Sequence, residues 1–222
     1  MASVSFSSQA SLYKFEDMNA NNGGMADNLE SIQSTYNTSS NQFTWDVVFN
    51  DNSSGVDGFW LVVNNGPDPK SSNVNELAIM YGDRDSGILT TYAYNGQNSA
   101  SSYLNPRILL QTDTFTAGPD GLSIDIDVSA INAWVSPDPD YSGIQFDENV
   151  DLWFHISKNS NFSYGQGGLL EGYSYGSQGW YDRAGLSAEE VTDISTAVVP
   201  EPGAFALLLF GLAGLRLCKK RA

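Results

Sequence analysis

Residues 42–50 read QFTWDVVFN, a stretch in which apolar and polar side chains alternate. Successive side chains of a β-strand point to opposite faces, so this alternation predicts a strand with one buried and one solvated face. Thr44 and Asp46 fall on the solvated face. The residues predicted to face the core are Phe43, Trp45, Val47 and Phe49.

The same two-residue period recurs in LSIDIDV at 122–128 and in VDLWFHIS at 150–157. Clusters of Gly, Asn, Asp and Pro separate these stretches, as turns do between strands. About ten short strands in roughly 180 residues favour an all-β fold, a two-sheet antiparallel sandwich of the jelly-roll type. Further strands are predicted at Leu12–Phe15, Phe59–Val63, Glu76–Tyr81, Ile88–Tyr94 and Arg107–Gln111.

The composition excludes several classes of function. The 222 residues include 26 acidic and 10 basic side chains, giving a formal net charge of −16. Nucleic-acid binding is excluded, because a phosphate backbone requires a surface rich in Lys and Arg. The single Cys excludes an intrachain disulfide and the single His excludes a multi-histidine metal site. The acidic excess leaves two interpretations, solubility or the binding of a hard divalent cation.

The C-terminal segment differs from the rest of the chain. Ala204–Leu215 reads AFALLLFGLAGL and carries no charge. This run is short for a bilayer core of about 30 Å, but it crosses if the flanking basic side chains reach the headgroups. The basic end predicts a cytoplasmic C-terminus and an acidic domain outside the membrane. The basic residues of this end are Arg216, Lys219, Lys220 and Arg221.

The motif Pro200-Glu201-Pro202 precedes the apolar run, and its two prolines keep the backbone extended and accessible. The order of Pro-Glu-Pro, apolar helix and basic end resembles the PEP-CTERM sorting signal of Gram-negative bacteria. The resemblance implies export, transient anchoring in the inner membrane and processing by the transpeptidase exosortase. It also implies a final location at the cell surface or in the extracellular matrix, in association with exopolysaccharide and biofilm. Pro200, Glu201 and Pro202 are then recognised residues of a substrate.

The resulting domain organisation has three parts. Residues 1–183 are predicted as an extracellular β-sandwich, broadly similar to concanavalin A-like or jelly-roll domains of surface proteins. Residues 184–199 form a linker with a short helix, because Ser187-Ala188-Glu189-Glu190 matches a capping box. Residues 200–222 are the sorting signal. The first 20 residues lack the pattern of a signal peptide, so we expect the true start to lie upstream.

Two aromatic stretches are candidate glycan-binding residues. Sugar rings stack their C–H faces on aromatic side chains, and binding sites combine such walls with a few polar groups. If the period-two pattern holds, Asp151, Trp153 and His155 share an outward face; alternatively a covering loop makes Trp153 part of a second core and gives His155 a neighbour. The second stretch is a binding loop or a strand pair closing the sandwich. It contributes Tyr173, Tyr175 and Trp180.

A candidate metal site lies in the sequence Asp83-Arg84-Asp85-Ser86-Gly87. Alternating carboxylates that end in Gly are able to wrap a hard cation, so Asp83 and Asp85 are candidate Ca²⁺ ligands. The alternative interpretation is an ordinary Asp-rich turn, because Asp side chains hydrogen-bond nearby backbone N–H groups.

These observations favour a surface or matrix protein without enzymatic activity, which is structural or glycan-binding. One alternative is a secreted glycan-active hydrolase on the same sandwich fold, since a pair of carboxylates suffices for that chemistry. A serine hydrolase is disfavoured, because the Gly-x-Ser-x-Gly match at 172–176 has no His downstream. Another alternative is a membrane-anchored surface protein that exosortase never cuts.

Overall fold

The computed structural model describes the chain in several stretches that together contain all the strands below. These stretches are residues 11–18, 20, 23–24, 29–50, 56–64, 77–94, 108–135, 143–144, 146 and 148–191. The side chains of residues 23–24, 64, 77, 94, 149, 151 and 182–187 are outside this description. The predicted sorting signal at 200–222 and the second half of the predicted linker, residues 192–199, also lie outside it.

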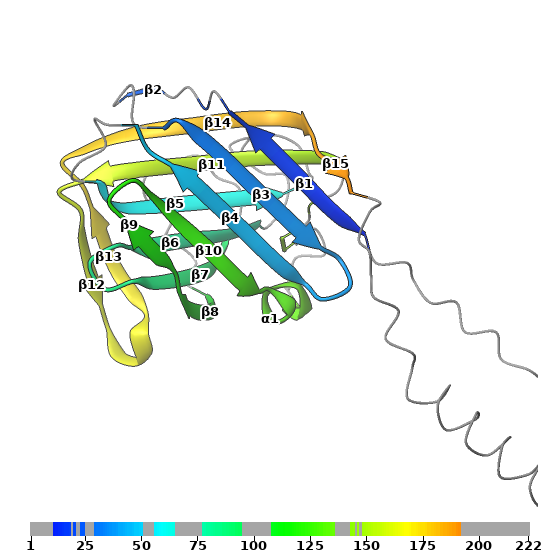
Figure 1. Cartoon of the computed structure of the whole chain (residues 1–222). Helices are drawn as coiled ribbons and strands as arrows, with labels where there is room; N and C mark the ends of the chain where they lie inside the picture. The colour runs from blue at the N-terminus through cyan, green and yellow to red at the C-terminus, as the bar shows by residue number, and fades with distance from the viewer. Residues whose placement is uncertain are drawn as a thin grey trace, which may run out of the picture. The chain divides into compact units, whose positions relative to one another are not determined.

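Two large antiparallel sheets form the described domain, as the sequence predicts, and Figure 1 shows them as two layers. The six-stranded sheet runs β15 (Glu189–Glu190), β1 (Leu12–Asp17), β3 (Ser31–Asn37), β4 (Gln42–Val48), β10 (Gly121–Asp127) and β9 (Thr116–Gly118). The seven-stranded sheet runs β2 (Gly23–Gly24), β14 (Ser177–Ser187), β11 (Asn149–Lys158), β5 (Val56–Asn64), β6 (Leu77–Asp83), β7 (Ile88–Tyr94) and β8 (Leu109–Thr114).

Four smaller elements complete the described fold. The five-residue helix α1 (Ser129–Ala133) follows β10, and its Ile131 is fully buried. Strands β12 (Asn161–Tyr164) and β13 (Leu170–Ser174) pair only with each other, with a 3-10 turn at Gln166–Gly168 between them. We call β12, the turn and β13 the arm.

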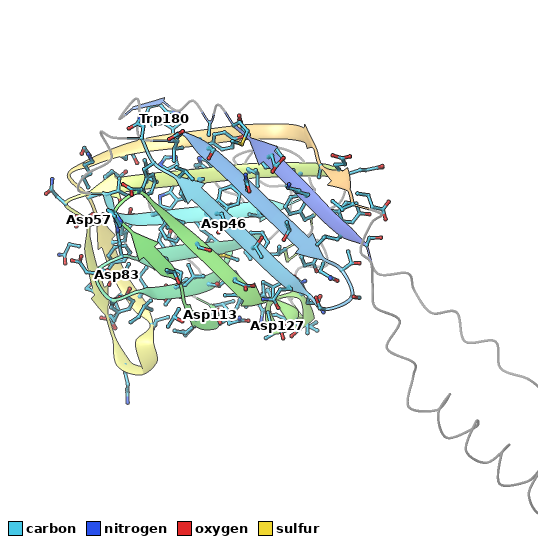
Figure 2. All side chains as sticks on the ribbon, viewed as in Figure 1. Asp46, Asp57, Asp83, Asp113, Asp127 and Trp180 are labelled. Atoms are coloured by element: carbon cyan, nitrogen blue, oxygen red, sulfur yellow. The ribbon has the colours of Figure 1, made fainter. Side chains whose placement is uncertain are left out.

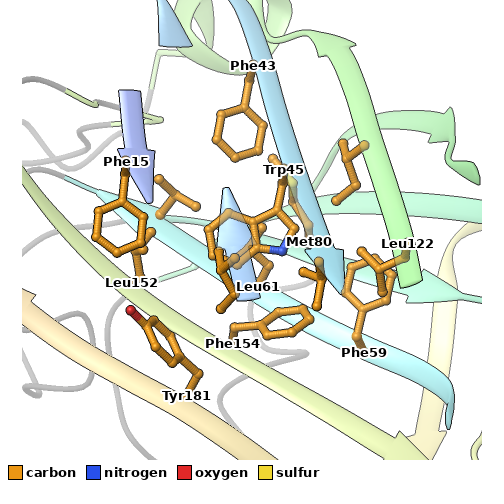
Figure 3. Packing of buried hydrophobic residues seen from close by; sticks show 14 of the residues in the cluster. Phe15, Phe43, Trp45, Phe59, Leu61, Met80, Leu122, Leu152, Phe154 and Tyr181 are labelled. Carbon is orange, nitrogen blue, oxygen red and sulfur yellow. The ribbon is translucent and has the colours of Figure 1, made fainter. Parts of the chain in front are cut away.

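The core lies between the two sheets and confirms the predicted facing of the strands. Figure 3 shows Trp45 on one sheet and Phe154 on the other within this cluster, and their ring centroids are 5.4 Å apart. The ring centroids of Phe59 and Phe154 are 5.8 Å apart. All the alternating residues predicted to face inward are buried. They are Phe43, Trp45, Val47, Phe49, Leu122, Ile124, Ile126, Val128, Val150, Leu152, Phe154 and Ile156.

The predicted helix at residues 187–190 is wrong. Strand β14 continues to Ser187, and after Ala188 the chain forms β15, which pairs with β1. The capping box is a local signal, whereas the backbone here has partners from distant strands: the N–H of Ala188 donates to the carbonyl of Glu148 at 3.0 Å. Such tertiary pairing overrides a weak local preference. The sandwich therefore extends past the predicted boundary at 183.

The chain enters and leaves the described domain at one corner. The N–H of Val191 donates to the carbonyl of Leu12 at 2.8 Å, and the Ser11 hydroxyl donates to the Glu190 carboxylate at 2.7 Å. Within the described residues no helix is long and apolar enough to span a bilayer. The apolar run at 204–215 lies outside these residues.

Candidate glycan-binding surface

The outer face of the seven-stranded sheet carries a second apolar cluster. Strand β5 includes FWLVV, so apolar side chains project from both of its faces, as in a strand that is covered on both sides. Phe59 points into the main core and Trp60 into the second cluster. The buried members of this second cluster are Trp60, Val62, Ile79, Tyr81, Tyr92, Trp153 and Leu170.

The arm packs on this face and is attached through tyrosine hydroxyls. The backbone N–H of Leu170 donates to the hydroxyl of Tyr92 at 2.5 Å. The Tyr173 hydroxyl lies 2.6 Å from the Ser157 hydroxyl on β11. The arm thus covers a sheet face that would otherwise expose large aromatic rings to water.

Trp153 is not a surface residue, so its predicted role as a glycan contact is wrong. Its side chain is only 2% exposed, and its ring meets Trp60 edge-on at 4.4 Å. The alternative interpretation, a covered face with Trp153 in a second core, is confirmed. The alternation of β11 correctly placed Trp153 on the outer face, but alternation does not report what covers that face.

His155 lies between buried and exposed aromatic rings and has protein partners at both ring nitrogens. Its ring stacks on Trp60 at 3.9 Å and faces Trp180 at 6.2 Å. The indole N–H of Trp153 donates to Nε2 at 3.1 Å. Because an indole is only a donor, Nε2 accepts, and Nδ1 donates its proton to Oε1 of Gln178 at 3.0 Å. His155 is therefore held neutral in this geometry.

Trp180 and Tyr175 are the two exposed large aromatic side chains of the described part of the chain, at 38% and 43%. Trp180 pairs across β14 with His155 on one side and with Gly23 on the other. Gly23 has no side chain to cover the indole. Figure 2 shows Trp180 at this β2 margin of the domain.

These residues form a connected row, with exposed aromatic side chains at its two ends, that we call the aromatic strip. Gln178 lies opposite Ser157 in the β11–β14 register, and Ser157 bonds Tyr173. Tyr173 in turn contacts the ring of Tyr175 at 5.6 Å. The aromatic strip comprises Tyr173, Tyr175, Gln178, His155 and Trp180. Four of the six predicted glycan contacts thus belong to it; Trp153 is buried, and the side chain of Asp151 lies outside the described residues.

Two supporting residues were not predicted. Gln178 orients His155, and Trp60 stacks on the His155 ring from the neighbouring strand β5. Trp60 had a visible signal, because alternation along FWLVV separates it from Phe59 and Leu61. Its proximity to His155 depends on the β5–β11 register, which pairs the two residues directly and is not encoded locally.

Burial raises the pKa of Tyr173 from 10.0 to about 12, against the opposing effect of its hydrogen bonds to Ser157 and Ser160. The unfolded state releases this proton at a lower pH than the folded state does. The contribution of Tyr173 to the free energy of unfolding is therefore complete below pH 10 and is lost as pH rises towards 12. The loss amounts to about 2–3 kcal/mol. In urea unfolding at a series of pH values, the free energy of unfolding of Tyr173→Phe should decline less steeply over this range than that of the native protein. Parallel declines would contradict this assignment.

The predicted metal ligands form a hydrogen-bonded turn between β6 and β7. The Asp83 carboxylate accepts the Ser86 hydroxyl at 2.7 Å, the Asp85 N–H at 3.1 Å and the Tyr164 hydroxyl at 3.4 Å. Asp85 is exposed. Within the described residues there is no group of three or more His, Cys, Asp or Glu side chains suited to a metal ion. The turn interpretation accounts for Asp83, and Ca²⁺ binding stays a prediction.

A shallow hollow of about 410 Å³ lies on the opposite side of the domain, on the outer face of the six-stranded sheet. Asp46 and Asp120 line it, and Asp46 accepts the Ser123 hydroxyl at 2.5 Å. Figure 2 shows Asp46 on this sheet, away from Trp180. The hollow has no exposed aromatic side chain in its lining, so it does not add to the aromatic strip.

The fold and surface together define an all-β sandwich with a part-exposed aromatic strip on one sheet. No protein-family model, curated protein or solved structure matches this chain.

Proposed function

We propose that this chain is an exported surface or matrix protein that binds glycan through the aromatic strip without catalysing a reaction. The observation that carries the proposal is the part-exposed indole of Trp180, which stacks beside His155, whose ring in turn stacks on Trp60. An exposed ring with a fixed support offers a flat apolar surface at little entropic cost, which is what the C–H face of a sugar requires.

Polar groups beside the indole suit the same ligand. The side chain of Gln178 is half-buried, and Tyr175 presents an exposed phenol in the turn that precedes β14. These groups are able to exchange hydrogen bonds with sugar hydroxyls, while the rings supply contact area. Trp180 and Tyr175 are exposed to solvent, which favours a binding module over an enzyme that must exclude water from its substrate.

The last described residue of the domain lies apart from Trp180. Val191 follows β14, which ends at Ser187, and lies beside Leu12. Trp180 is seven residues before Ser187 on β14, about 23 Å from it at the usual rise of a β-strand. Trp180 and the Ser187 end of β14 are therefore well separated.

The jelly-roll topology and the sorting signal belong to the same proposal. In each sheet, strands far apart in the sequence lie side by side: β4 beside β10, and β5 beside β11. Such pairing of distant strands is expected of a Greek-key sandwich. The Pro-Glu-Pro motif, apolar run and basic end support export, transient anchoring in the inner membrane and recognition by exosortase, with exopolysaccharide as the partner outside.

Co-sedimentation of the full-length protein with the exopolysaccharide of its own host tests the binding proposal. We expect saturable binding that free oligosaccharides from the same polymer compete away. A repeat in the presence of a chelator tests the predicted Ca²⁺ dependence separately. Absence of saturable binding in both conditions would contradict the glycan-binding role.

C-terminal peptide mapping of the protein recovered from its host tests the sorting proposal. We expect mature protein that lacks residues 203–222, because processing should act at the extended Pro200-Glu201-Pro202 segment. A double substitution, Pro200→Ala with Pro202→Ala, should retain the tail. A native protein that still carries residues 203–222 would favour the uncleaved, membrane-anchored alternative.

A further inference from the structure

We infer that the glycan bound by the aromatic strip is a polymer of uncharged sugars, and that acidic polysaccharides are rejected. This inference rests on the proposed glycan-binding function and specifies its ligand class. It follows from the position of the basic side chains, the polar chemistry of the strip and the charge of the whole domain.

The domain is poor in cations. Residues 1–199 contain 25 acidic and 6 basic side chains. Recognition of a uronate or sulfated sugar uses Arg or Lys, which pair with the anionic groups. The basic side chains that the structure describes are Lys14, Arg84 and Lys158.

None of these three cations projects from the strip. Lys14 lies on the other sheet and forms an ion pair with Glu16 at 2.7 Å. Arg84 donates to the backbone carbonyls of Val56, at 2.5 Å, and Gly118. Lys158 pairs across the strands with Val56, whose side chain faces the main core, so this lysine belongs to the face opposite the strip.

The polar groups of the strip are themselves uncharged. His155 accepts from Trp153 and donates to Gln178, an arrangement that requires its neutral form. Gln178 and Tyr175 contribute an amide and a phenol group, which suit sugar hydroxyls. A uronate chain would meet these groups without gaining an ion pair, and would approach a strongly negative domain.

Repulsion between like charges lowers both the association rate and the affinity, and salt screens it within about 10 Å. An uncharged hexose polymer avoids this cost and retains the stacking contact with Trp180. The binding of a neutral chain should therefore be nearly independent of salt, whereas any binding of an acidic chain should strengthen as salt rises.

The test measures binding of the full-length protein to two sets of soluble polymers at low and high salt. The neutral set is a β-glucan, a galactan and a mannan, and the acidic set is polygalacturonate and alginate. We expect at least one neutral polymer to bind about tenfold or more tightly than both acidic polymers at low salt. The Trp180→Ala variant should lose that binding, which assigns it to the strip.

A charge-adding variant sharpens the test. Ser174 is exposed at the end of β13, beside Tyr175. Ser174→Lys should increase affinity for polygalacturonate several-fold while leaving neutral binding unchanged, and Ser174→Gln is the uncharged control. An unchanged polygalacturonate affinity in Ser174→Lys would count against the charge argument.

The possible failures are distinguishable. Acidic polymers that bind as tightly as neutral ones, with loss in Trp180→Ala, would overturn the inference and leave the proposed function intact. Binding of acidic polymers only with added Ca²⁺ would likewise overturn the inference and leave the proposed function intact. Binding of no polymer in either set, together with no binding of the host exopolysaccharide, would overturn both.

Discussion

Replacement of Trp153 by alanine should lower the free energy of unfolding by about 3–5 kcal/mol, as large truncations at fully buried aromatic sites do. The indole is 2% exposed and packs edge-on against Trp60 at 4.4 Å. Its loss leaves a cavity beneath the arm and removes the N–H that donates to Nε2 of His155. The measurement is the urea unfolding curve of the full-length protein, followed by circular dichroism.

Trp134→Ala is the matched control, because that indole follows α1, is half-buried and belongs to neither core cluster. Trp134→Ala should lower the free energy of unfolding clearly less than Trp153→Ala does. Trp153→Phe keeps most of the volume and should recover much of the stability. If Trp153→Ala were as stable as the native protein, the second core would not exist as described.

Replacement of Trp180 by alanine should weaken glycan binding strongly and change the free energy of unfolding little. We expect the affinity for the bound glycan to fall about 30-fold or more, since truncation of an aromatic hot spot costs about 2 kcal/mol or more. Stability should change by less than about 1 kcal/mol, because the side chain is 38% exposed. Isothermal titration of the full-length protein with the glycan measures the first quantity, and urea unfolding the second.

Two variants separate stacking from other effects of this substitution. Trp180→Phe keeps an aromatic face and should retain part of the affinity. Tyr175→Ala should weaken binding by a smaller factor, because its ring is at the end of the strip beside Tyr173. An affinity that is the same in Trp180→Ala and the native protein would remove this residue from the binding surface.

The two-sheet fold was accessible from local patterns wherever one strand face is apolar and the other polar. Residues 42–50 and 122–128 alternate, and β4 and β10 pair directly, with Trp45 opposite Ile124. Strand β3 was not predicted, because SIQSTYN has mostly polar side chains. It forms between two neighbours that supply hydrogen bonds along its whole length.

The candidate site was only partly predictable, because burial of an outer face depends on distant segments. The alternation in β11 put Trp153 and His155 on one face, which is where they lie. The ring of Trp153 is nevertheless buried in the second cluster, together with Leu170 of the arm. The arm is a separate pair of strands, β12 and β13, and local alternation does not show that this pair covers the sheet. Trp180 stays part-exposed because its neighbour on the far side is Gly23.

We expect the exposed Trp180 end of the aromatic strip to contact the glycan. The most direct measurement uses full-length protein in which all five tryptophans carry 5-fluorotryptophan, with ¹⁹F NMR spectra recorded during titration with the host exopolysaccharide. We assign the Trp180 resonance from Trp180→Phe and expect it to shift most, with Trp45 and Trp134 unchanged. Saturable binding that shifts the Trp134 resonance and leaves that of Trp180 in place would contradict the account.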